Sequence, residues 1–273
     1  MIGSLRRAVR SLEKVDPPER QPTKGFFTDT TLCIGCKACE VACKEWNQLP
    51  AEPLHWTGNS YDNTGSLSST TWRHVRFVEQ IEADRLAPRW LMMSDVCKHC
   101  ANAPCQEVCP TGAIIRTEFD TVYVQQDVCN GCGYCIAACP FGVIDRNPRD
   151  GGAHKCTLCY DRLKVGEQPA CAKVCPTQSI QFGDLDDLRS RAEKRIADLQ
   201  ARGQKTAYLY GHDEEVLDGG LHAFFLLLDR PDTYNLPARP PRPIKNAAPG
   251  YLATLAMAVG LVMAGALSFR RRP

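Results

Sequence analysis

Hydrophobic and polar positions divide the chain into a polar start, a middle of short apolar segments and an apolar end. Residues 1–24 are polar and basic with three prolines, which predicts an N-terminal arm or a strap over a partner. Arg6-Arg7 resembles a twin-arginine export signal only superficially, because no apolar stretch follows it. We therefore expect no cleavable signal at this end.

Short segments of the middle have the composition of β-strands joined by turns. Residues 113–127 contain two β-rich arms around the polar link Glu118-Phe119-Asp120, which predicts a hairpin. Strand-like segments at 72–78 and 90–93 lie within an insertion at residues 48–93. They predict a loop followed by a second hairpin.

Other strands are expected to pair over long sequence distances. Phe26-Phe27 near the start and residues 179–182 have the composition of two strands that could lie side by side. Residues 224–228 are apolar at every position, which predicts a buried strand.

A helix is predicted to follow Asp184. This residue can act as the N-cap, and Gly203 ends a pattern of apolar residues at helical spacing. We expect this apolar stripe to pack on the core. It consists of Leu185, Leu188, Ala192, Ile196 and Leu199.

The apolar end predicts a single transmembrane helix. Residues 251–269 carry no charge, and this length is just enough for the hydrocarbon core of a bilayer. A buried soluble helix is the alternative. Basic residues both precede and follow the span, so the positive-inside rule gives no clear orientation. Small residues at four-residue spacing would let it pack closely against a membrane partner; they are Ala256, Gly260 and Ala264.

Composition changes this picture through sixteen cysteines, which stand in four tight quartets with none left over. The first and third quartets have the spacing C-x2-C-x2-C-x3-C, with which bacterial ferredoxins hold [4Fe-4S] clusters. The second quartet has two extra residues, and the fourth has eleven residues between its second and third cysteines. In chain order the quartets are Cys33, Cys36, Cys39, Cys43; Cys97, Cys100, Cys105, Cys109; Cys129, Cys132, Cys135, Cys139; and Cys156, Cys159, Cys171, Cys175.

Disulfides and zinc are the alternative uses of these cysteines. A C-x2-C-x2-C run crowds thiols too locally for sixteen to pair off as disulfides. Structural zinc needs two ligand pairs separated by a longer finger, whereas the first quartet lies within eleven residues. His99 is interpreted as a neighbour of the ligands or a surface residue, because the cysteines are complete without it. The pattern predicts four [4Fe-4S] clusters.

The fourth cysteine of a quartet cannot easily reach the iron that the first three leave open, so it is expected to serve a neighbouring cluster. The hairpin at 113–127 joins quartets two and three, which predicts that these two form one unit. Quartets one and four then form the other, and pairing one with two and three with four is the alternative. The expected ligand sets are Cys33, Cys36, Cys39 and Cys175; Cys43, Cys156, Cys159 and Cys171; Cys97, Cys100, Cys105 and Cys139; and Cys109, Cys129, Cys132 and Cys135.

The predicted fold class is α+β, with two pseudo-symmetric ferredoxin-like units that each hold two clusters, and one C-terminal transmembrane helix. The expected boundaries are the arm at 1–24; quartets one and four in 25–47 and 151–183; the insertion, which covers a cluster, at 48–93; quartets two and three in 94–150; a helix and strand extension at 184–236; a Pro-rich linker at 237–248; the membrane helix at 249–269; and a basic tail at 270–273.

The formal net charge of +2 counts the cysteines as neutral. An oxidised [4Fe-4S] cube with four thiolates carries about −2, so four of them would bring the total to roughly −6. Lysines near the ligands could offset part of this charge, although we expect any one of them to be a solvated surface residue. They are Lys37, Lys44, Lys98, Lys155, Lys164 and Lys173.

With these features the chain resembles the iron-sulfur (beta) subunit of membrane-bound formate dehydrogenase. The resemblance runs from about Phe26 to the end of the membrane helix. Relatives in nitrate reductase replace one cysteine by tryptophan, whereas every ligand position here is cysteine. The matching stretches are Cys-Ile-Gly-Cys-Lys-Ala-Cys-Glu-Val-Ala-Cys-Lys-Glu-Trp-Asn from Cys33, Tyr-Asp-Asn from Tyr61, Cys-Gly-Tyr-Cys-Ile-Ala-Ala-Cys-Pro-Phe around Cys135, Lys-Cys-Thr-Leu-Cys from Lys155, and the helix ending at Gly203.

The resemblance implies a non-catalytic subunit without catalytic residues. It implies that electrons from formate oxidation at a molybdopterin or tungstopterin subunit pass through four [4Fe-4S] clusters to a membrane cytochrome b and quinone. The implied surroundings are a lipid bilayer around residues 249–269, an outer or periplasmic soluble domain and no nucleic acid. The equivalent subunit of a hydrogenase, or of a polysulfide, dimethyl sulfoxide or nitrate reductase, is one alternative, and a zinc-binding structural module is another.

Overall fold

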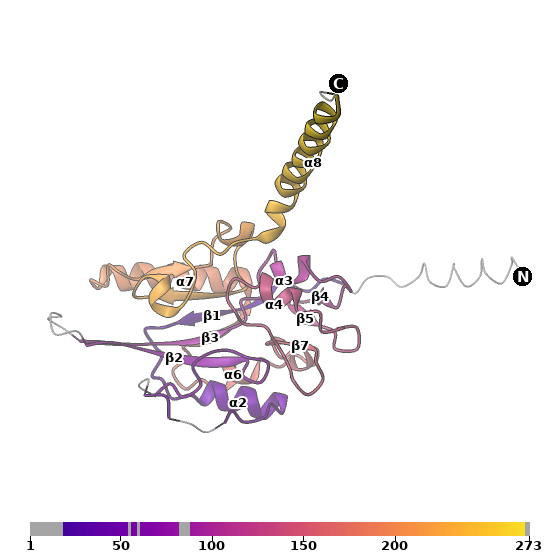
Figure 1. Cartoon of the computed structure of the whole chain (residues 1–273). Helices are drawn as coiled ribbons and strands as arrows, with labels where there is room; N and C mark the ends of the chain where they lie inside the picture. The colour runs from indigo at the N-terminus through magenta and orange to yellow at the C-terminus, as the bar shows by residue number, and fades with distance from the viewer. Residues whose placement is uncertain (1–18, 54–55, 59–60, 82–87, 271–273) are drawn as a thin grey trace, which may run out of the picture.

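In the computed structural model, which describes residues 19–53, 56–58, 61–81 and 88–270, one sheet joins distant segments of the chain (Figure 1). The outer part of the expected N-terminal arm, residues 1–18, lies outside the described residues. In order, the strands are β8 (Ile180–Asp184), β1 (Lys24–Asp29), β10 (Ala223–Leu227) and β9 (Tyr208–Tyr210).

The central strand β1 pairs with its neighbours in opposite senses. It is antiparallel to β8, with Phe26 opposite Phe182, and parallel to β10, with Phe27 opposite Phe224. The expected pairing of the Phe26 segment with residues 179–182 is therefore confirmed. Gln21 N–H also donates to Glu118 O at 2.9 Å, so the described end of the arm lies along the rest of the chain.

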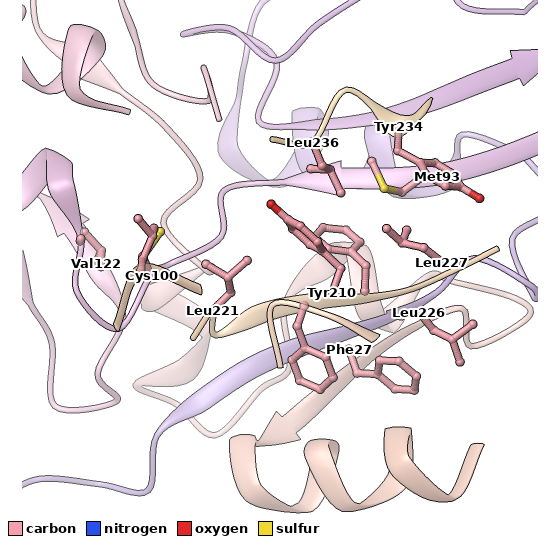
Figure 2. Close-up of a cluster of buried hydrophobic side chains, with 14 of the residues drawn as sticks. Phe27, Met93, Cys100, Val122, Tyr210, Leu221, Leu226, Leu227, Tyr234 and Leu236 are labelled. Atoms are coloured by element: carbon pink, nitrogen blue, oxygen red, sulfur yellow. The ribbon is translucent and has the colours of Figure 1, made fainter. Parts of the chain in front are cut away.

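Both faces of this sheet are covered, which explains the uninterrupted apolar sequence of β10. Every residue of β10 is buried, as expected from its composition. Helix α7 (Leu185–Ala201) packs on one face. A ribbon of β2 (Arg73–Gln80) and β3 (Arg89–Val96) contributes Met93 to the core on the other face. Figure 2 shows Leu226 pointing toward the helix, whereas Leu227 gathers with Met93 on the opposite side.

The predicted helix after Asp184 is confirmed, but the side chain of Asp184 does not have the capping role that we expected. The helix begins at Leu185 and ends at Ala201, and Gly203 follows with φ +93°. Asp184 occupies the N-cap position, but its side chain makes no capping hydrogen bond and pairs with Lys24 instead.

Both predicted hairpins are present. The segments β4 (Ile114–Arg116) and β5 (Val122–Val124) pair antiparallel, as do β2 and β3 of the insertion. A third hairpin, which the sequence pattern did not predict, is formed by β6 (Asp145–Arg146) and β7 (Ala153–His154) between quartets three and four.

Short helices accompany the cysteine quartets and pack in two pairs. Helix α2 packs against α6, and α3 packs against α4, so quartet one meets quartet four and quartet two meets quartet three. The helices are α2 (Ala38–Asn47), α3 (Pro104–Glu107), α4 (Tyr134–Ala138), α5 (Tyr160–Leu163) and α6 (Ala170–Lys173). Short 3-10 turns follow later in the chain: η1 (Val216–Asp218), η2 (Pro231–Tyr234) and η3 (Pro243–Asn246).

The apolar end forms helix α8 (Ala247–Arg270). Figure 1 shows it projecting from the side of the molecule that carries α3 and α4, whereas α2 and α6 lie at the opposite end. None of its residues is buried, and within the described ranges it is the one helix long and apolar enough to cross a membrane. The expected linker at 237–248 is shorter than predicted, because Pro243 starts the η3 turn and the helix begins at Ala247.

Candidate metal centres

The sixteen cysteines surround four separate cavities, and each cavity is bordered by four of them. All sixteen thiols are free. We name them A to D. Cavity A is lined by Cys33, Cys36, Cys39 and Cys175; B by Cys43, Cys156, Cys159 and Cys171; C by Cys97, Cys100, Cys105 and Cys139; and D by Cys109, Cys129, Cys132 and Cys135.

Each cavity therefore takes three cysteines from one quartet and one from another. The groups are the ones expected from the spacing, with quartet one joined to four and quartet two joined to three. The structure brings together all four members of every expected set. That these members ligate clusters stays a prediction.

Tight glycine loops bring the first cysteines of quartets one and three to one cavity each. Gly35 has φ +65° and Gly131 has φ +68°, a backbone conformation that side chains disfavour. A Cβ atom would lie 2.6 Å from Phe77 Cε1 at Gly35 and 2.3 Å from Gly151 O at Gly131. Both positions therefore require glycine for space as well as for conformation.

Helix α2 explains how one quartet serves two cavities. Cys39 and Cys43 are one helical turn apart, and they line cavities A and B respectively. The helix therefore separates the fourth cysteine from the first three, as the spacing predicted.

The cavities adjoin one another in the order A, B, C, D. Burial raises the pKa of Cys39, and Cys171 of cavity B raises it further. Burial also raises the pKa of Cys156, and among neighbouring thiols Cys97 of cavity C adds most to this rise. The pKa of Cys105 in cavity C is raised by burial, and Cys135 of cavity D contributes. Thiols of A and B, of B and C, and of C and D are thus close enough to interact electrostatically.

The two outer cavities reach the surface, whereas the two inner ones are enclosed. Cys36 of cavity A and Cys132 of cavity D are exposed. All four cysteines of cavity B are buried, and in cavity C only Cys139 is partly exposed. The middle of the array is therefore shielded from water, and both of its ends are open to solvent.

Burial makes these thiols poor anions unless a metal or a cation stabilises the thiolate. Burial raises the pKa of both Cys39 and Cys105 to about 12. The positive charge of Arg73 partly opposes this rise at Cys39, and that of Lys155 partly opposes it at Cys105. Cys109 differs, because hydrogen bonds from Thr111 and from backbone N–H groups outweigh burial and lower its pKa.

Two of the lysines expected at the surface are buried, which corrects that prediction for them. Lys98 is fully buried beside Asp95, and its Nζ donates to Val96 O at 2.8 Å. Lys155 is 3 % exposed, and its Nζ donates to Cys156 O at 3.0 Å. These hydrogen bonds replace the ones that each ammonium group would make with water at the surface. Lys164 and Lys173 are exposed, as expected.

His99 is a buried residue that lines cavity C beside the cysteines, so of its two interpretations the neighbour of the ligands is the one the structure supports, and the surface residue is excluded. Its Nδ1 accepts a hydrogen bond from Val122 N–H at 3.1 Å, and Nε2 is buried without a protein partner. Burial lowers its pKa well below the usual value, which keeps the ring neutral.

Sequence reasoning missed Arg73, a fully buried residue on the wall of cavity B. Its Nη2 donates to Cys171 Sγ at 3.2 Å. Nothing in the sequence distinguishes it from Arg76 on the same strand, because only the fold decides which of the two side chains lies among the thiols.

The base of the apolar helix is bonded to the part of the molecule that carries cavity D. Arg242 Nε donates to Glu107 Oε1 at 2.8 Å, and its Nη1 donates to Asp218 Oδ2 at 3.0 Å. Lys245 pairs with Asp218 as well. Glu107 is the last residue of α3 and lies two positions before Cys109. These basic residues thus contact the soluble part of the chain.

Comparison with known protein families identifies the cysteine-rich part of the chain. Two models of a 4Fe-4S dicluster domain match residues 32–113 and 88–185. The first match spans quartets one and two. The cavities instead join quartet one to quartet four, whose cysteines lie more than 100 residues further along the chain and outside that match.

Similar curated proteins are subunits of formate dehydrogenases and of a thiosulfate reductase. The formate dehydrogenase iron-sulfur subunit of Haemophilus influenzae is 44 % identical over 78 % of this chain and 68 % of that protein. The iron-sulfur subunit of the nitrate-inducible formate dehydrogenase of Escherichia coli is 42 % identical over 84 % of this chain and 80 % of that protein. The thiosulfate reductase electron transfer subunit of Salmonella typhi is 42 % identical over 58 % of this chain and 74 % of that protein.

The chain thus combines 4Fe-4S dicluster domains with sixteen cysteines that line four cavities in groups of four. Its relatives are electron-transfer subunits rather than catalytic ones. The chain belongs to the family of formate dehydrogenase iron-sulfur subunits.

Proposed function

We propose that the chain conducts electrons one at a time through four [4Fe-4S] clusters, one in each of cavities A to D. The four cysteines that line each cavity are the proposed ligands. The observation that carries the proposal is the division of sixteen free cysteines among four separate cavities with none left over. Cavities A and B belong to one ferredoxin-like unit, 25–47 with 151–183, and cavities C and D to the other, 94–150.

The spacing of the thiols fits a cluster better than a single ion. In the described part of the chain, no three His, Cys, Asp or Glu side chains converge as one metal ion would require. Each set of four thiols instead lines the wall of a separate cavity. A polynuclear centre fits that arrangement, whereas tetrahedral zinc needs its four ligands around one point.

When bound, a [4Fe-4S] cluster supplies a one-electron centre whose potential depends on hydrogen bonds to sulfur and on solvent exposure. The side chains of this protein would influence both properties. Thr111 lies with its hydroxyl 3.7 Å from Cys109 Sγ, and Thr177 lies 3.8 Å from Cys175 Sγ. Buried side chains around cavities B and C exclude water from the middle of the row.

The position of the apolar helix supports a direction of electron flow. The contact of Arg242 with Glu107 brings the base of α8 to the side of cavity D. We propose that cavity D faces the membrane acceptor, a cytochrome b that passes electrons to quinone, and that α8 is the membrane anchor. Cavity A, at the far end of the row, would accept electrons from the catalytic subunit. That subunit would oxidise formate at a molybdopterin or tungstopterin, and the soluble part would lie on the outer face.

The complex purified from membranes tests this proposal. We expect formate to reduce an artificial dye and a quinone analogue, and we expect formate to bleach the visible absorption of the chain's clusters. A complex that contains this chain but shows no formate-dependent bleaching, while hydrogen or a sulfur compound produces it, would move the chain to a related complex.

A further inference from the structure

Arg73 is a cation with no carboxylate partner in the interior of the unit that holds cavities A and B. Its side chain is fully buried, and the ring of Phe26 lies 4.8 Å from its guanidinium carbon. Among the described residues no carboxylate forms an ion pair with it, and its Nε has no hydrogen-bond partner. A guanidinium stays charged in proteins, so this charge needs another source of compensation.

The compensation lies in thiols of two different cavities. Nη2 donates to Cys171 Sγ of cavity B at 3.2 Å. Nη1 lies 3.3 Å from Ser94 Oγ, which is itself 3.2 Å from Cys39 Sγ of cavity A. Arg73 therefore stands between the two cavities and interacts with both.

The position has an electrical consequence that rests on the proposed function. Each reduction adds one negative charge to a site, and a fixed cation nearby stabilises the more negative state. We propose that Arg73 is a positioning residue that raises the reduction potentials of the centres in cavities A and B together. It keeps these two neighbours within a range where electrons pass from one to the other.

Redox titration of the purified complex, followed by low-temperature EPR, tests this inference. Arg73→Gln removes the charge and keeps a hydrogen-bond donor, and Arg73→Lys keeps the charge. In Arg73→Gln we expect the ratio of reduced to oxidised centre at a fixed potential to fall at least tenfold in A and B, or about 59 mV for one electron. We expect Arg73→Lys to retain most of the wild-type potential, and C and D to change far less.

Arg89→Gln is the matched control. Arg89 lies at the other end of the same ribbon, opposite Gln80, roughly 23 Å from Arg73, and it contacts Leu228 O at 2.9 Å. We expect no change of any potential in this variant. Full iron content with unchanged potentials in Arg73→Gln would overturn the inference, as would equal shifts in the Gln and Lys variants.

Two further outcomes are decisive as well. If Arg73→Gln and Arg73→Met lose the centres of A and B while Arg73→Lys keeps them, the charge itself is required and the inference stands. If all three variants lose them equally, the shape of the side chain matters rather than its charge, and the inference fails. Failure of the proposed function has a separate signature, because wild-type protein would then lack iron and sulfide.

Discussion

Arg242, just before the apolar helix, donates through Nε to Glu107 Oε1 at 2.8 Å, and Glu107 lies between two cysteines that line cavities C and D. The Arg242 side chain is 22 % exposed and that of Glu107 is 19 % exposed, so this contact is better shielded than most surface pairs. It joins the candidate membrane anchor to the end of the proposed electron path.

Arg242→Ala is expected to slow electron transfer to quinone without affecting earlier steps. The loss of the contacts with Glu107 and Asp218 would let the soluble part tilt on α8 and move cavity D away from its acceptor. We predict a several-fold fall in formate-to-quinone activity, with unchanged formate-to-dye activity and iron content. Arg230→Ala, which breaks an exposed pair with Asp232, is the control. Equal losses of both activities would contradict this interpretation.

Separate substitution of Cys175 and Cys43 tests how the quartets pair. Cys175→Ser is expected to alter the centre of cavity A, and Cys43→Ser that of cavity B, with the EPR signals of C and D retained. The physical reason is that each serine removes a thiolate from one site alone. A first effect of either change on the centres formed by quartets two and three would show that the pairing is wrong.

A charge in the middle of α8 tests its role as membrane anchor. The helix has 24 residues, which makes it about 36 Å long, enough for a hydrocarbon core of about 30 Å. Val259→Arg is expected to cost roughly 2.5–3.5 kcal/mol of insertion free energy. We predict that the chain becomes extractable from membranes by alkaline carbonate. Val165→Arg, at an exposed position of the soluble part, should have no effect, and equal extraction of both variants would argue against the anchor.

His222 predicts a pH dependence of stability. Burial lowers its pKa to about 4 from the usual 6.5, Asp120 partly opposes this shift, and Arg116 adds to it. The buried ring is neutral in the fold, so its contribution is fully present above pH 6.5 and is lost as the pH falls from about 6.5 to about 4. The shift corresponds to roughly 3 kcal/mol.

The measurement is the rate at which the visible absorption is lost between pH 7 and pH 5. We expect His222→Gln to reduce the acceleration that the wild type shows as the pH falls. His212→Gln, at a partly exposed position beside Asp213, is the control and should follow the wild type. Identical pH profiles for wild type and His222→Gln would contradict the prediction.

The elements predicted well are those whose signal is local. The helix after Asp184, the hairpin at 113–127 and the apolar end each have a periodicity or composition that one segment carries by itself, and all three are present. The hairpin of β6 and β7 escaped prediction, because its strands have two residues each and leave no periodic pattern.

In the candidate sites, too, the features with a local sequence signal were predicted and those that depend on the fold were not. Cysteine spacing is local, and it predicted that the fourth cysteine of a quartet serves another site. Which quartets join was predicted from the hairpin between quartets two and three, which is also a local element. The burial of Lys98, Lys155 and His99, and the position of Arg73 between two cavities, depend on strands that meet only in the fold. No neighbouring residue in the sequence signals these contacts.

Iron and acid-labile sulfide analysis of the purified chain with its partners tests the central claim most directly. The account predicts about sixteen iron and sixteen sulfide per copy of this chain, after subtraction of the partners' own content, with little zinc. Zinc in the cysteine sites without sulfide, or iron sufficient for only two clusters, would contradict it.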